Sequence, residues 1–167
     1  PAPTPLIRET LHLSVDAAAG GAAPAARGFG PVFRDRRFMA FIALMILATI
    51  PSPILWMLMP AYAKEHFGVL EQQAGLIMST NAAMVVLLQV AVTRWSAQRP
   101  HLRMLALGAL IYALGVGSVA LGAGFWAFWV SMVILTFGEL LIAPTGTAYA
   151  ANAAPPDMRG RYMGLYG

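Results

Sequence analysis

Four long apolar runs follow a polar N-terminal segment and determine the predicted architecture. They cover about residues 38–62, 74–93, 104–122 and 125–151, each near or above the roughly 20 residues that a helix needs to cross about 30 Å of hydrocarbon. Helices are expected because they satisfy their backbone polar groups internally, whereas an open sheet edge cannot face lipid. A further helix is expected to start at about 162–167. The pattern predicts an all-α, multi-pass transmembrane helical bundle with about four complete spans.

The N-terminal segment predicts a different kind of structure. Residues 1–37 hold an Ala/Gly/Pro tract at 17–31 and no apolar run long enough for a signal-peptide core. We therefore interpret 1–37 as a largely flexible cytoplasmic linker and 38–167 as the transmembrane region. Because the chain begins on Pro and ends as a new apolar segment starts, we interpret it as an internal fragment of a longer protein.

Composition supports a membrane protein and excludes several other classes. Apolar residues make up 59% of the chain and charged residues only 11%, whereas soluble proteins average about 45–50% and 25%. The net charge of +4 comes from basic residues between the apolar runs, not from one stripe, and no nucleic-acid-binding motif is present, so the expected partner is the lipid bilayer. No cysteine is present, which excludes disulfides and thiolate metal sites. We expect no metal and no cofactor.

Basic residues predict the orientation of the spans. If consecutive helices are antiparallel, ten of the eleven basic residues lie on one side of the membrane and Lys64 alone on the other. The Arg-rich side, with the N-terminal segment, is expected to be cytoplasmic in the cell (inner) membrane. The loop arginines that define it are Arg94, Arg99, Arg103, Arg159 and Arg161. These arginines are explained if they set the orientation of the spans in the membrane. The alternative is that they hold helix ends together by pairing with acidic side chains or backbone carbonyl groups.

Glu139 is the candidate for proton coupling or substrate binding. It is the one ionisable residue in the interior of a predicted span, where a charge costs about 2.5–3.5 kcal/mol or more. Desolvation favours the neutral form of a carboxyl group, so Glu139 is suited to gain and lose a proton or to pair with a cationic substrate. The alternative is a structural glutamate that supports the kink at Pro144. The functional interpretation is favoured because ionisable residues inside membranes are functional by default.

Polar residues near Glu139 are candidates for lining a cavity. Asn81 and Gln89 lie eight residues apart in the second span, about 80° apart on a helical wheel, so both can face one broad cavity. Interhelical hydrogen bonding without a transport role accounts for them equally well. Thr136 lies on the same helical face as Glu139 and is a third candidate.

Prolines and small residues predict kinks and packing. Pro51 and Pro53 in the first span, and Pro144 followed by Gly146 in the fourth, should kink or locally open their helices. Ala109, Ala113 and Gly117 lie four residues apart in the third span, with Gly108, Gly115 and Gly122 nearby. This spacing predicts that they form its packing face.

Four motifs together resemble the major facilitator superfamily, over nearly the whole chain. They are "VFRDRRF" at 32–38, "TRWSAQRPHLR" at 93–103, "GEL" with Pro144, and "APPDMRGRYMG" at 154–164. They are similar to the second half of such a transporter, helices seven to ten and the start of eleven, and most like bacterial drug:proton antiporters. The resemblance implies a carrier whose remaining helices complete a midplane site and give alternating access.

The predicted function is that of a secondary active transporter fragment, not an enzyme. The resemblance implies proton-coupled efflux of small amphipathic or drug-like molecules, with a small-molecule substrate and protons as partners. Proton-coupled peptide or other solute importers of the same superfamily are the first alternative. A non-transporting membrane anchor or assembly subunit is the second. An intramembrane enzyme is disfavoured because the spans hold one acid and no histidine, too few groups for a catalytic set.

Overall fold

The computed structural model describes residues 28–167, and this part of the chain is helical without strands. The chain divides into two units, Pro1–Asp35 and Arg36–Gly167. The first contains the short helix α2 (Gly30–Arg34). The helices of the second are α3 (Arg36–Thr49), α4 (Pro51–Phe67), α5 (Glu71–Ala97), α6 (His101–Leu121), α7 (Phe125–Ala153) and α8 (Arg159–Tyr166). The predicted linker falls mostly outside the described residues.

Four helical stretches of the second unit are long and apolar enough to cross a membrane, which confirms the predicted fold class. They are Arg36–Phe67, which joins α3 and α4, then Glu71–Ala97, His101–Leu121 and Phe125–Ala153. Most extend a few residues beyond the apolar runs, because polar residues continue the backbone hydrogen bonding past the hydrocarbon-compatible segment. Many large apolar side chains are exposed, among them Met57, Val86 and Leu87. Such a surface fits contact with lipid or further helices and not with water.

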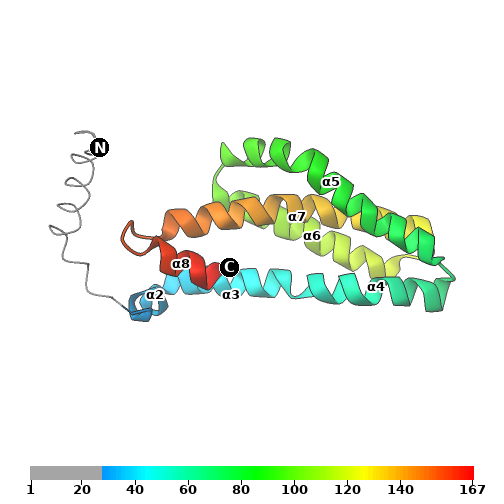
Figure 1. Ribbon diagram of the computed structural model, residues 1–167, viewed down its shortest axis with the longest axis horizontal. Helices are drawn as coiled ribbons and strands as arrows, with labels where there is room; N and C mark the ends of the chain where they lie inside the picture. The colour runs from blue at the N-terminus through cyan, green and yellow to red at the C-terminus, as the bar shows by residue number, and fades with distance from the viewer. Residues whose placement is uncertain (1–27) are drawn as a thin grey trace, which may run out of the picture. The chain divides into compact units, whose positions relative to one another are not determined.

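The first span is interrupted where prolines follow one another. The helix is broken at Ile50, between α3 and α4. Pro51 and Pro53 have no backbone N–H, so the carbonyl groups four residues before them, at Leu47 and Thr49, lose their helical donors. The two helices continue in nearly the same direction beyond this point (Figure 1). Pro144, by contrast, lies inside one continuous helix, α7, and the predicted kink there stays a prediction.

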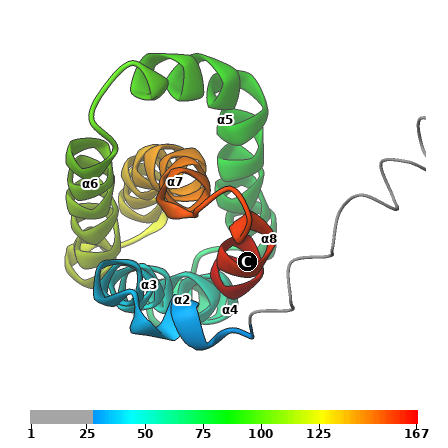
Figure 2. The ribbon, with the colours of Figure 1, turned by 90° about the vertical axis from the view of Figure 1, so that its left-hand side faces the viewer.

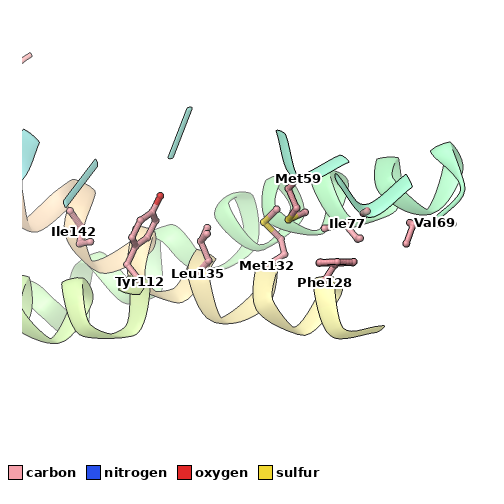
Figure 3. Packing of buried hydrophobic residues seen from close by; sticks show 9 residues of the cluster. Met59, Val69, Ile77, Tyr112, Phe128, Met132, Leu135 and Ile142 are labelled. Atoms are coloured by element: carbon pink, nitrogen blue, oxygen red, sulfur yellow. The ribbon is translucent and has the colours of Figure 1, made fainter. Parts of the chain in front are cut away.

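Helix α7 is the centre of the second unit (Figure 2). Half of its apolar window is buried, against at most 22% for the other three spans. It packs along most of α6 and along part of α5, with smaller contacts to α3 and α8. Figure 3 shows how Phe128, Met132 and Leu135 of α7 meet Met59 of α4 and Ile77 of α5 in the apolar core. The buried side chains of α7 therefore lie against several neighbouring helices.

Close packing of α6 on α7 depends on glycine. A Cβ on Gly115 would lie 2.5 Å from the backbone nitrogen of Leu135, and one on Gly138 would lie 2.5 Å from that of Tyr112. The helices approach this closely because neither position carries a side chain.

Of the small residues predicted to pack in the third span, Gly108 and Gly115 contact α7, whereas Ala113 and Gly117 do not. Gly117 has open space around it and Ala113 is exposed. The face that meets α7 carries Gly108, Tyr112 and Gly115. It is offset around the helix from the row of Ala109, Ala113 and Gly117, so that the small residues at a regular spacing of four point mostly away from α7.

Candidate functional site

A buried polar network joins α5 to α7 near the middle of both helices. The side-chain amide nitrogen Nδ2 of Asn81 donates to Oγ1 of Thr136 over 2.9 Å and to Oε2 of Glu139 over 3.0 Å. Asn81 is 6% exposed and Thr136 is fully buried, while Glu139 is half-buried. We call these three residues the Glu139 site. Three of the residues singled out in the sequence thus meet in one place.

The hydrogen bonds of the site run in a defined direction. Thr136 accepts from Asn81 and donates its own hydroxyl hydrogen to the backbone carbonyl of Met132 over 2.7 Å. Both amide hydrogens of Asn81 are used. Because an amide N–H can only donate, Asn81 presents a hydrogen-bond donor to the carboxyl group of Glu139. Oε1 of Glu139 takes no part in this contact and is the oxygen left for a proton or a cation.

Gln89 does not join this site. Its side-chain nitrogen donates to Thr93, one turn further along the same helix, over 3.0 Å. The two candidates of the second span therefore have different environments: Asn81 contacts α7, whereas Gln89 satisfies its amide within α5.

The proline and glycine candidates lie elsewhere. Pro51 and Pro53 begin α4, and Pro144 lies in α7, five residues beyond Glu139. A Cβ on Gly146 would lie 2.5 Å from the hydroxyl oxygen of Tyr166, at the contact with α8. None of the four is part of the hydrogen-bonded group around Glu139.

The five loop arginines lie at the end of the second unit where α5 ends, α6 begins and α7 turns into α8 (Figure 1). Lys64 is near the end of α4, at the opposite end, where it pairs with Glu71 over 2.6 Å. Among the arginines, Arg99 places its guanidinium 4.1 Å from the ring centroid of Trp95. This cation–π contact lies at the C-terminal end of α5, whereas the Glu139 site lies near the middle of that helix.

Sequence reasoning missed several interhelical contacts. The indole nitrogen of Trp129 donates to Thr80 over 3.0 Å, and Ser118 donates to Ser131 over 2.8 Å. Tyr112 was also missed, although it packs against Gly138, the residue before Glu139. A buried tyrosine needs a polar partner for its hydroxyl, and that requirement was the signal available for Tyr112.

The chemistry of the site is that of a membrane-embedded carboxylate held by a neutral donor. No cluster of three or more His, Cys, Asp or Glu residues exists within residues 28–167. The arrangement can bind a proton or a cation at Glu139. Its single carboxylate gives little to a hydrolytic mechanism, which needs several converging groups.

Comparison with known proteins identifies the family. The model for the Major Facilitator Superfamily matches residues 3–167. The chain belongs to the major facilitator superfamily. This finding confirms the family resemblance, and with the four apolar helices it indicates a multi-pass membrane protein.

Curated relatives of this superfamily chain are transporters with different names. A "Na(+), Li(+), K(+)/H(+) antiporter" of Planococcus maritimus is 28% identical over 151 residues, which is 82% of this chain and 36% of the relative. "Multidrug resistance protein MdtH" of Yersinia enterocolitica is 26% identical over 144 residues, 86% of this chain and 36% of the relative. The chain thus spans about a third of the length of these relatives. No solved structure matched it.

We expect Asn81 and Gln89 to differ sharply when each is replaced by leucine in the full-length superfamily transporter. Asn81→Leu leaves a carboxylate without its donor in a low-dielectric interior, which costs about 1–3 kcal/mol. The melting temperature in detergent, followed by tryptophan fluorescence, should fall for Asn81→Leu. Gln89→Leu is the matched control in the same helix, and its melting temperature should change little. Equal effects of the two substitutions would contradict a special role for the contact between Asn81 and Glu139.

Proposed function

We propose that this chain is part of a proton-coupled antiporter in which Glu139 binds a proton and a monovalent cationic substrate in turn. The observation that carries the proposal is the hydrogen bond from Asn81 to Glu139, inside two helices that are long and apolar enough to cross the membrane. A carboxylate in that position is costly unless it is held, protonated or paired. Asn81 holds it without neutralising it, which leaves the charge available for exchange.

The proposed cycle uses the proton as the competitor of the substrate. When Glu139 is charged, a cation can pair with its carboxylate. When a proton enters from the outer side and binds the carboxyl group, the attraction for the cation is lost and the cation leaves. The superfamily architecture supplies alternating access, with the remaining helices of the full-length transporter enclosing the midplane site.

Two cation classes are candidates for the substrate. Small amphipathic or drug-like organic cations fit the apolar surroundings of Glu139, and a multidrug resistance protein is among the relatives. Alkali-metal ions are the second candidate, because a relative with 28% identity is named as a sodium, lithium and potassium antiporter. Carboxylate and hydroxyl oxygens, which the site contains, suit hard cations.

Inverted membrane vesicles that contain the full-length protein test the proposal. An acidic interior is established by respiration, and the release of protons is followed with a pH-sensitive dye after adding sodium, lithium, potassium or a cationic drug. Proton release above that of vesicles without the protein supports antiport, and the cation that elicits it identifies the class. Absence of release with every cation would contradict the proposal.

We also propose that the linker 1–37 and the Arg-rich end of the bundle face the cytoplasm. The basic residues gathered at that end support this orientation. Because the chain has no cysteine, single cysteines can be introduced at Gln98 and Ala123, in the turns at opposite ends of α6. In intact cells a membrane-impermeant thiol reagent should label Ala123→Cys and not Gln98→Cys. The reverse labelling pattern would contradict the orientation.

A further inference from the structure

The hydroxyl group of Tyr112 is buried without a hydrogen-bond partner among the described residues. The residue is only 7% exposed and lies on α6. Buried hydroxyl groups are nearly always paired, so an orphaned one indicates a missing water, ion or ligand. In Figure 3 the Tyr112 ring rises from α6 with its oxygen at the far end, on the side of α3 and α4 and away from the ribbon of α6.

The backbone of Tyr112 lies at one of the two closest contacts between α6 and α7. Gly138 lies against the backbone of Tyr112, so that a Cβ there would be 2.5 Å from its nitrogen and 2.7 Å from its Cα. Glu139 follows directly in α7. The backbone of Tyr112 is therefore packed against the turn of α7 that carries Glu139.

Two polar groups influence the hydroxyl without bonding to it. The negative charge of Glu139 acts on Tyr112 electrostatically, and Ser52 in the first turn of α4 is close enough to interact with it. By distance and angle, however, the hydroxyl group of Tyr112 forms no hydrogen bond with Ser52. Tyr112 of α6 is thus within electrostatic range of Glu139 in α7, and its hydroxyl group forms no hydrogen bond with the described residues.

We propose that Tyr112 is a specificity-determining residue of the Glu139 site, whose hydroxyl oxygen contacts the monovalent cation that replaces the proton on Glu139. This inference rests on the proposed function and adds a second contact for the substrate. A phenol hydroxyl has lone pairs for a cation and a hydrogen for a neighbouring acceptor. The shared ligand chemistry is a single positive charge, either an alkali-metal ion or an organic ammonium group.

The test compares Tyr112→Phe with the unchanged full-length protein in the vesicle assay. Phenylalanine keeps the ring that packs in the core and removes only the oxygen. We expect the KM for the transported cation to rise by about tenfold or more, as for loss of a hydrogen bond to a charged group. The maximal rate and the melting temperature should stay close to those of the unchanged protein. Sodium, lithium, potassium and a cationic dye are tested separately, so the probe with the raised KM identifies the source of the charge.

Tyr149→Phe is the matched control. Tyr149 lies in α7, ten residues beyond Glu139, and its ring centroid is 4.5 Å from that of Phe41. The KM of the Tyr149→Phe variant for the cation should not change. An unchanged KM in Tyr112→Phe, or a fall in its maximal rate alone, overturns the inference about Tyr112. In that case the proposed function still stands if Glu139→Gln is inactive. Retention of exchange by Glu139→Gln overturns the proposed function and this inference with it.

Discussion

Replacing Glu139 by glutamine is expected to reduce cation-driven proton release to the level of vesicles that lack the protein. Glutamine has nearly the same shape as glutamate. Its side-chain oxygen can still accept the hydrogen bond from Asn81, which spans 3.0 Å in the unchanged protein. It cannot gain or lose a proton. The substitution therefore removes the charge and the proton-binding group while it preserves the packing of α5 on α7. The measurement is the rate of proton release at saturating cation.

Two controls make this result interpretable. Equal amounts of protein in the membrane and an unchanged melting temperature exclude misfolding. Binding of a fluorescent cationic probe then distinguishes two roles: retained binding without transport assigns Glu139 to proton coupling, whereas loss of both assigns it to substrate binding as well. Unchanged transport in Glu139→Gln would mean that the carboxyl group is structural, and that coupling depends on other residues of the full-length protein.

The spans were predictable because the solvent imposes a simple rule. A bilayer requires long apolar segments, and helices are the only open structures that satisfy their own backbone groups within it. Four such segments were expected, and four are present in the described residues. The interruption at Pro51 was expected for a local reason, the missing backbone donor of proline.

The Glu139 site was predictable only in part. Glu139 stands out because a lone acid in an apolar run has a high cost, and this needs no tertiary information. The choice between Asn81 and Gln89 does need it, because two amides about 80° apart on one helix are equivalent until the neighbouring helix is placed. The structure separates them: α7 passes next to Asn81, and Gln89 bonds within its own helix.

Which small residues of α6 meet α7 could not be predicted from the sequence, because α6 is apolar on every side. Periodicity gives no direction in such a helix. The regular spacing of Ala109, Ala113 and Gly117 suggested a face, but helix packing is decided by which small residue meets a backbone on the partner. That position is Gly115, two residues before the open Gly117.

Two of the glycines of α6, Gly115 and Gly117, provide the second prediction with a large effect. Gly115→Ala places a Cβ 2.5–2.7 Å from the backbone nitrogen and Cα and from the Cβ of Leu135, atoms that cannot move aside like the end of a flexible side chain. The helices must separate, and overpacking of this kind costs about 1–3 kcal/mol or more. Thermal unfolding in detergent, followed through the tryptophans, should show a clearly lower melting temperature. Gly117→Ala adds the same methyl group two residues away into open space, and its melting temperature should be unchanged or slightly higher. Equal stability of the two variants would show that α6 does not pack on α7 through Gly115.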